Sequence, residues 1–280
     1  MEIHPILEGG VDPSPNLWYV LSAVGECPSM RIGHTCTHVP KAQSNGKLYF
    51  IGGANPSGTF AEVYVLDLDT HIWDTIECAG LKARYEHSAF LPSCQPDKIY
   101  IFGGADQYGN MNDIQVFDTV SNTWSSVTCT GNAPTPRIFH NGPCIGNRLI
   151  VYSGGDKGTD PVGDRQVYSY DALTNTWTTV RTSGTPPKPR LGHLMVAVGD
   201  KVFVHGGMSG TTFYSDLHIL DLGNSTWTAV KQKKDQPPAR TGHSGYVSGS
   251  DIYLFGGMNR DGALDDFYKL DTGWNISISH

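Results

Sequence analysis

Short apolar runs separated by polar turns recur along the whole chain. Typical runs have five residues, are rich in β-branched and aromatic side chains, and end on glycine or aspartate, as in Lys98-Ile-Tyr-Ile-Phe102 and Ile114-Gln-Val-Phe-Asp118. None repeats with the 3.6-residue period of an amphipathic helix. The pattern therefore predicts an all-β protein built from many short strands.

The predicted strands come in blocks of about fifty residues that share four markers in a fixed order. Each block has Arg-x-x-His before its first strand, Gly-Gly after the second and Asp at the end of the third, and in the first four blocks a Trp follows that Asp by six residues. The glycine pairs are Gly52-Gly53, Gly103-Gly104, Gly154-Gly155, Gly206-Gly207 and Gly256-Gly257. Four markers that recur together indicate a repeat fold, whereas a lone Gly-Gly would carry little weight.

A single four-stranded sheet cannot bury both of its faces, and radial stacking of such sheets gives a β-propeller. The repeated pattern resembles the Kelch family over residues 17–274. We therefore expect an all-β Kelch β-propeller with five recognisable four-stranded repeats. The expected segments are an N-terminal tail at 1–16, a ring-closing strand at 17–23, repeats at about 31–77, 84–128, 137–181, 190–231 and 240–274, and a C-terminal tail at 275–280.

Two tryptophans leave the closure of the ring open. Trp18 precedes the first Arg-x-x-His, so residues 17–21 are interpreted as a fourth strand without a block, while Trp274 follows Asp271 by three residues rather than six. The chain is then either a five-bladed ring closed by its N-terminal strand or the six-bladed family architecture without its last blade. The resemblance favours the second, which predicts exposed edges and self-association.

The loops of such a repeat fall on two faces. With strands named a to d along each block, the b–c loops and d–a connections share one face, and they are longer and more variable than the opposite turns. Variable loops on a rigid scaffold are typical binding sites, so we predict a partner on this face. The candidate contacts are Phe60, Tyr85, Tyr108, Phe139, Phe213, Tyr214 and the arginines Arg31, Arg84, Arg137, Arg190 and Arg240, which alternatively brace the d–a turns.

Composition narrows the class of protein further. The net charge of −7 argues against a general nucleic-acid binder, and no apolar run approaches the roughly 20 residues of a membrane helix. The N-terminus lacks the features of a secretory signal, and the six cysteines contain no CxxC pair, so reduced thiols are expected.

Catalytic patterns are not found in the sequence. It contains no GxSxG, HExxH or GxxxxGK[ST] motif. The repeating histidines take one equivalent place in each block and offer no compact ligand set, so a structural part is favoured over a metal ring. We expect no catalytic residues, no metal and no cofactor.

Some segments point to one branch of the Kelch family. Arg84-Tyr-Glu-His87, Leu91-Pro-Ser-Cys94 and Gly52-Gly-Ala-Asn-Pro56 are similar to Kelch proteins that act as Rab GTPase effectors in transport from late endosomes to the trans-Golgi network. That resemblance implies a non-enzymatic cytoplasmic adaptor that binds a GTP-loaded Rab and other trafficking proteins and associates peripherally with endosomal or trans-Golgi membranes. The alternatives are a Kelch substrate receptor of a cullin ubiquitin ligase and, third, a propeller enzyme.

Overall fold

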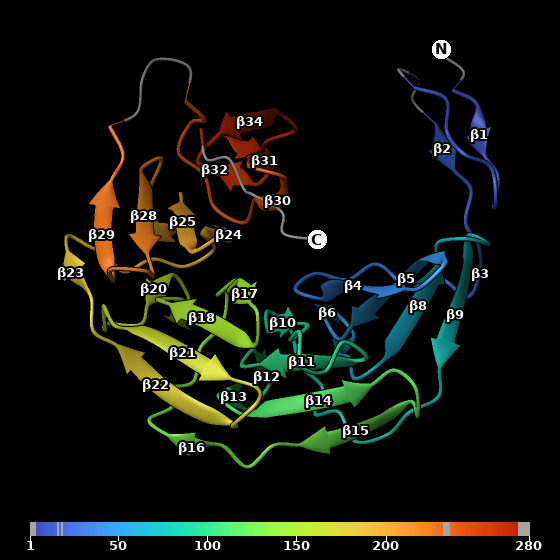
Figure 1. Ribbon diagram of the computed structural model, residues 1–280, viewed down its shortest axis with the longest axis horizontal. Helices are drawn as coiled ribbons and strands as arrows, with labels where there is room; N and C mark the ends of the chain where they lie inside the picture. Colours follow the sequence, from blue (N-terminus) through green and yellow to red (C-terminus); the bar gives the residue numbers. More distant parts are fainter. Residues whose placement is uncertain (1–3, 16, 18, 232–235, 274–280) are drawn as a thin grey trace.

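The structure is a computed structural model that describes residues 4–15, 17, 19–231 and 236–273. Its strands form five blades in a ring, with strands a innermost (Figure 1). The described part of the chain contains no helix, and so none that is long and apolar enough to cross a membrane. The predicted all-β propeller built from five repeats is confirmed.

Each blade is an antiparallel sheet with its strands in chain order. Blade 1 contains β4 (Thr35–Lys41), β5 (Ser44–Ile51), β8 (Val63–Asp67) and β9 (Ile72–Ile76). Blade 2 contains β10 (Ser88–Phe90), β11 (Lys98–Phe102), β14 (Ile114–Asp118) and β15 (Thr123–Ser126). Blade 3 contains β17 (Cys144–Ile145), β18 (Arg148–Tyr152), β21 (Val167–Asp171) and β22 (Thr176–Val180). Blade 4 contains β24 (Leu194–Val198), β25 (Lys201–His205), β28 (Leu217–Asp221) and β29 (Thr226–Ala229), and blade 5 contains β30 (Ser244–Ser248), β31 (Asp251–Phe255) and β34 (Phe267–Asp271).

Shorter strands complete the sheets and loops. Small hairpins occupy the b–c loops: β6 (Ala54–Asn55) with β7 (Gly58–Thr59), β12 (Ala105–Asp106) with β13 (Gly109–Asn110), β19 (Gly155–Lys157) with β20 (Asp160–Pro161), β26 (Met208–Ser209) with β27 (Thr212–Phe213), and β32 (Met258–Asn259) with β33 (Gly262–Ala263). Three d–a connections, β3 (Val24–Gly25), β16 (Thr130–Gly131) and β23 (Ser183–Gly184), pair in parallel with strand d of the following blade. In the N-terminal segment, β1 (Ile6–Leu7) pairs with β2 (Val20–Leu21).

The Asp that ends strand c shapes the tight c–d turn. In blade 2, Asp118 Oδ1 accepts hydrogen bonds from the backbone N–H groups of Val120 and Ser121, both at 3.0 Å. Asn122 completes the turn with a φ of 56°, a left-handed conformation that asparagine tolerates better than most residues. This turn sets the register in which Trp124 lies opposite Phe117.

The core lies between the blades, where side chains of one sheet pack on the next. Trp177 of blade 3 is 2 % exposed, and its ring centroid lies 4.8 Å from that of Phe102 in blade 2. Trp227 of blade 4 lies 5.1 Å from Tyr152 of blade 3 in the same way. The large aromatic area buried at these two joints stabilises the stacking of the blades.

A backbone hydrogen bond repeats at every joint between consecutive blades. The N–H that follows strand b of one blade donates to the carbonyl of the motif arginine in the next blade, at 2.8 to 3.0 Å. The four bonds are Gly53 to Arg84, Gly104 to Arg137, Gly154 to Arg190 and Gly207 to Arg240. This bond gives successive blades the same relative placement.

The glycine marker of blade 3 is displaced by one residue from the structural repeat. Gly154, not Gly155, donates the bond between blades, so Ser153 occupies the place that Gly52, Gly103, Gly206 and Gly256 hold elsewhere. Ser153 is fully buried and has a φ of 55°. The alignment of glycine pairs by sequence alone was therefore wrong by one position in this blade.

The ring opens between blade 5 and blade 1. In the described residues, β34 pairs with β31 on one edge and with no strand on the other. The N-terminal segment with β1 and β2 lies across the opening from blade 5 (Figure 1). Trp18 and Trp274 lie outside the described residues, so closure by residues 17–23 stays a prediction.

Candidate binding face

The predicted binding face is formed by the b–c hairpins and the ends of the d–a connections. Isolated β-bridges tie the two together in every blade: Ile32 with Ala54, Tyr85 with Ala105, Ile138 with Gly155, Leu191 with Met208 and Thr241 with Met258. The second residue of each Arg-x-x-His motif is thus paired with the start of a b–c hairpin. We call this surface the loop face.

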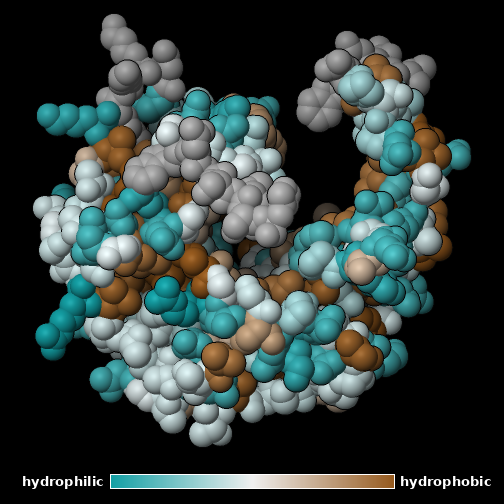
Figure 2. All heavy atoms as spheres, viewed as in Figure 1, coloured by the Kyte–Doolittle hydropathy of each residue, from teal (hydrophilic) through white to brown (hydrophobic). Residues whose placement is uncertain are grey.

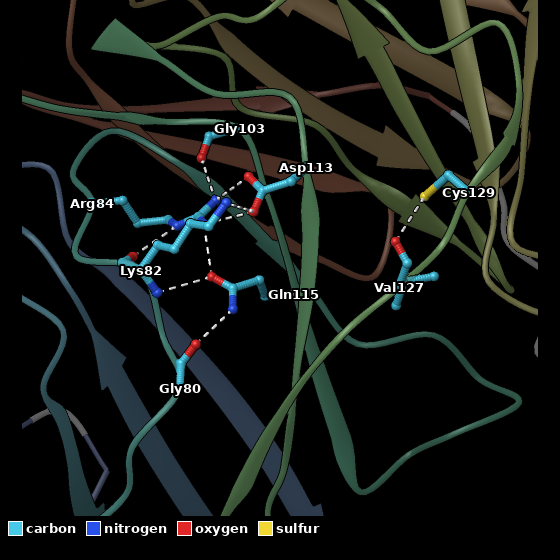
Figure 3. A network of polar contacts seen from close by, with 8 residues as sticks. All are labelled: Gly80, Lys82, Arg84, Gly103, Asp113, Gln115, Val127 and Cys129. Atoms are coloured by element: carbon cyan, nitrogen blue, oxygen red, sulfur yellow. Dashed lines mark hydrogen bonds and ion pairs between the residues drawn. The ribbon is translucent and has the colours of Figure 1, made fainter. Parts of the chain in front are cut away.

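The arginine of each Arg-x-x-His motif is buried beneath the loop face and holds its loops in place. Figure 3 shows Arg84 in blade 2, which is fully buried and makes five hydrogen bonds. Its Nη1 donates to Gly103 O and Asp113 Oδ1, both at 2.9 Å, its Nη2 to Asp113 Oδ2 at 3.0 Å and Gln115 Oε1 at 2.7 Å, and its Nε to Lys82 O at 3.1 Å. The guanidinium holds the pKa of the Asp113 carboxyl below its usual range, although burial alone would raise that pKa.

All five motif arginines have the same arrangement. Each donates to the carbonyl that follows strand b and forms an ion pair with an acidic residue of its own blade, and all are buried or nearly so. The pairs are Arg31 with Glu62, Arg84 with Asp113, Arg137 with Asp164, Arg190 with Asp216 and Arg240 with Asp266. This burial favours the bracing interpretation of the arginines over direct contact with a partner.

The acidic partners were missed by sequence reasoning. In four of the five blocks the acid stands five residues before the Asp of strand c, as Asp113 does before Asp118. In blade 3 the interval is seven residues, between Asp164 and Asp171. A buried arginine requires a counter-charge, so this regular acid was a signal that the sequence contained.

The third residue of each Arg-x-x-His motif links neighbouring blades along the inner strands. Glu86 N donates to Gly33 O at 2.6 Å, Gly192 N to Phe139 O at 3.0 Å and Gly242 N to Gly192 O at 2.8 Å. All five residues at this place have positive φ, including the non-glycine residues Glu86 (56°) and Phe139 (49°). Left-handed backbone is unfavourable for these side chains, and such strain often accompanies functional sites.

Glu86 carries a carboxyl with an altered proton affinity. Burial raises the pKa of this carboxyl to about 8, and its Oε2 has no hydrogen-bond partner within the described residues. The protonated, uncharged form of this carboxyl is therefore the main one at pH 7, which avoids an unpaired negative charge on the buried Oε2.

The predicted aromatic contacts differ in how freely they present their rings. Tyr108 is 87 % exposed at the tip of the β12–β13 loop, and Phe139 is 38 % exposed. Phe60 and Tyr214 are half-buried and lie 4.3 and 4.4 Å from the guanidinium carbons of Arg31 and Arg190, in cation–π contact. These two rings therefore brace an arginine, while Tyr108 and Phe139 are free to contact a partner.

The remaining two predicted aromatics line hollows in the loop face. Tyr85 lines a hollow of about 400 Å³ beside blade 1 together with Met30, Ile32 and Pro56, and Met30 is 92 % exposed. Phe213 lines a second hollow, of about 380 Å³, with Pro238 and Arg260. The loop face thus combines protruding rings with two shallow hollows, of which the one beside blade 1 is mainly apolar, as many interaction surfaces do.

The motif histidines are structural in character. In blades 2 to 5 they are buried, and burial lowers the pKa of His87, His140, His193 and His243 to about 3 in each case, so they are neutral at pH 7. They pack against the residue after strand b of the preceding blade: an added Cβ on Gly103 would lie 2.7 Å from His140 Cε1. Among the described residues no group of three His, Cys, Asp or Glu side chains is placed to hold a metal ion.

The five repeats of Arg-x-x-His, strand-end glycine and buried arginine–acid pair define a Kelch β-propeller. The sequence profile of the KLHDC2/KLHL20/DRC7 Kelch-repeats domain matches residues 33–257. The chain belongs to the Kelch-repeat family.

Similarity to individual proteins is more specific. The chain is 48 % identical over 216 residues to the Rab9 effector protein with kelch motifs of Mus musculus and 46 % identical over 216 residues to that of Homo sapiens, in each case over 76 % of this chain. The Danio rerio protein of the same name is 43 % identical over 234 residues, which are 79 % of this chain and 67 % of that protein. The matched region covers 57 % of the mouse protein and 58 % of the human one, so the chain spans a little over half of these curated relatives.

Proposed function

We propose that this chain is a non-catalytic interaction scaffold that binds the GTP-bound form of a Rab GTPase through its loop face, in transport from endosomes to the trans-Golgi network. The observation that supports this most directly is its identity of 46 to 48 % with Rab9 effector proteins with kelch motifs. The loop face supplies the exposed aromatic rings and hollows that such a contact requires.

Selectivity for the GTP form follows from the partner's chemistry. The switch segments of a GTPase are ordered by the γ-phosphate, so a rigid loop face can recognise one nucleotide state. Because the motif arginines are committed to pairs within their blades, the proposed anchors are Tyr108 and Phe139. The accompanying proposal for location is cytoplasmic, with peripheral association on endosomal or trans-Golgi membranes through the partner and other trafficking proteins.

The test measures binding to purified Rab9 loaded with a non-hydrolysable GTP analogue or with GDP. We expect binding to the GTP form, and a loss of at least about tenfold in affinity for the Tyr108→Ala Phe139→Ala variant, equivalent to about 1.4 kcal/mol. Val120→Ala is the matched control, since Val120 is 78 % exposed but lies in a c–d turn on the opposite face. Equal affinity for both nucleotide forms would reject the proposal.

A further inference from the structure

An apolar hollow lies between blade 4 and blade 5. It has a volume of about 420 Å³ and is partly open to solvent. Blade 4 contributes strands a to c and blade 5 strands b and c. The apolar side chains that line it include Phe203 and Leu217 from blade 4 and Ile252, Leu254, Tyr268 and Leu270 from blade 5. We call it the blade 4–5 pocket.

The corresponding place is filled by a tryptophan at the joint between blades 2 and 3 and at the joint between blades 3 and 4. Trp177 lies opposite Tyr170 of its own blade and stacks on Phe102, the last residue of strand b in the blade before. Trp227 lies opposite Leu220 and stacks on Tyr152.

By the same register, the residues equivalent to Leu220 and Tyr152 at the blade 4–5 joint are Leu270 and His205. Both line the blade 4–5 pocket. The pocket is therefore the place of a tryptophan on a fourth strand, and that strand would pair with the edge of β34 that no described strand occupies.

One segment of this chain has the spacing of such a strand. In blades 2 and 3, the d–a connection that follows strand d contains a glycine that pairs in parallel with the next blade. This glycine stands seven residues after the tryptophan of strand d, as Gly131 does after Trp124 and Gly184 after Trp177. Trp18 stands seven residues before Gly25, which pairs in parallel with Trp73 of blade 1. Residues 17–21 are thus spaced as the fourth strand of a blade that precedes blade 1.

This segment is held away from the blade 4–5 pocket of its own chain. β2 pairs with β1, and its side chains Val20 and Leu21 are 50 % and 46 % exposed. Figure 2 shows the N-terminal segment and blade 5 on opposite sides of the opening in the ring. The repeated hydrogen bonds between consecutive blades give blades 1 to 5 one common relative placement, and in that placement the opening lies between blade 5 and blade 1 (Figure 1).

We propose that residues 17–21 of a second copy of this chain occupy the blade 4–5 pocket, pair with the same edge of β34 and insert Trp18 against Leu270 and His205. Such strand exchange buries the apolar lining of the pocket and the exposed Val20 and Leu21 together. It also covers Phe267, which is 64 % exposed on β34.

The first test is the association state of the full chain, measured by sedimentation velocity over a range of concentrations. We expect concentration-dependent dimers or larger assemblies, and at least a tenfold weaker association for Trp18→Ala. Trp274→Ala is the matched control, and its association should equal that of the parent chain. A parent chain that stays monomeric throughout, or a loss of association on Trp274→Ala and not on Trp18→Ala, would overturn the proposal.

The second test places the strand by cross-linking. Val63 pairs with Ile76 in blade 1 and Val167 with Val180 in blade 3, so the same register places Leu21 opposite Phe267. In a background with Cys27→Ser and Cys36→Ser, which removes the two exposed thiols, we would mix chains that carry only Leu21→Cys with chains that carry only Phe267→Cys. A disulfide between the two chains supports strand exchange; a disulfide formed only within monomers of the double-cysteine chain identifies self-closure and contradicts it.

Discussion

Removing the carboxylate of Asp113 tests how the loop face is held in place. The Asp113→Ala variant leaves the fully buried guanidinium of Arg84 without its bidentate partner, while its bonds to Gly103, Lys82 and Gln115 remain. A buried charge that loses its partner typically costs 3 to 5 kcal/mol, and each hydrogen bond to a charged group contributes about 1.5 to 3 kcal/mol.

The exposure of the carboxylate reduces that figure. The side chain of Asp113 is 32 % exposed, so water can replace part of what the guanidinium loses. We therefore expect a loss of about 3 kcal/mol, a large share of the roughly 5 to 15 kcal/mol that stabilises a typical domain. The loss should lower the urea midpoint by about 1 M if the slope is near 3 kcal/mol per molar.

The assay is urea unfolding followed by tryptophan fluorescence, with Lys98→Gln as the control. Lys98 and Asp118 form an ion pair of 3.6 Å in the same blade, with side chains 41 % and 29 % exposed. Such a surface pair contributes less than about 1 kcal/mol. If Asp113→Ala destabilised the protein no more than Lys98→Gln, the bracing role of the buried arginines would be refuted.

Three further outcomes follow from the inner strands and the joints. In thermal unfolding, Ser153→Gly should destabilise the protein by about 1 kcal/mol and Ser153→Ala by about 1 kcal/mol more. Both variants lose the hydroxyl that donates to Arg190 O and accepts from Arg190 N, each at 2.8 Å, but only glycine relieves the strain of the positive φ. Glu86→Gln should stabilise the protein by about 1 to 2 kcal/mol at pH 8.5, a figure discounted for partial exposure, and should have little effect at pH 5. The carboxyl has a pKa of 4.5 in the unfolded chain and about 8 in the native state, so its destabilising effect grows as the pH rises from 4.5 to 8. Acidification from pH 7 to 5.5 should lower the free energy of unfolding by roughly 5 kcal/mol, and unfolding at the lower pH should take up nearly five protons. The reason is that five histidines have a pKa near 6.5 in the unfolded chain but are protonated in the native state only at about pH 3 or 4. These histidines are His87, His140, His193, His205 and His243. Calorimetry over this pH range measures both quantities.

Much of the fold was predictable because each marker residue has a local physical function. Asp118 fixes a turn through its own backbone neighbours, and Trp124 fills the joint six residues later, so both leave a fixed spacing in the sequence. The division into two loop faces followed from the alternating direction of the strands. The β-bridges between the second residue of each Arg-x-x-His motif and the b–c hairpins show that the d–a connections and the b–c loops lie on the same face.

Other features could not be obtained from spacing, because they depend on what the neighbouring blade supplies. In blades 2, 3 and 5 the backbone N–H of the motif arginine bonds to a b–c loop carbonyl, from Phe60, Met111 or Tyr214. The longer b–c loop of blade 3 does not supply that carbonyl, and the hydroxyl of Ser153 replaces it for Arg190. Because Gly154-Gly155 follows Ser153 directly, the sequence of blade 3 still matches the Gly-Gly marker and does not reveal that Ser153 takes the place of a glycine. The longer b–c loop of blade 3, by contrast, can be recognised in the sequence.

The candidate contacts show the same limit. Phe60 and Tyr108 both lie in b–c loops, and both were predicted as contacts. In the structure one ring covers a buried arginine and the other protrudes. Which aromatic is free depends on its place in the hairpin. Phe60 and Tyr214 stand seven residues after Gly53 and Gly207, to whose carbonyls their N–H groups donate, and each ring covers an arginine, whereas Tyr108 lies at the tip.

The joints also have a direction, which bears on how the ring is completed. Each blade donates a backbone N–H after strand b and accepts one at its motif arginine carbonyl, so the two sides of a blade are complementary and not alike. Within the described residues, Gly257 N on blade 5 and Arg31 O on blade 1 lack such a bond, and His34 is exposed where the other motif histidines are buried. The two ends of the ring therefore present the unsatisfied halves of one joint. Any blade or second copy that meets them must do so in the orientation of the other joints, because the reverse orientation would place donor against donor.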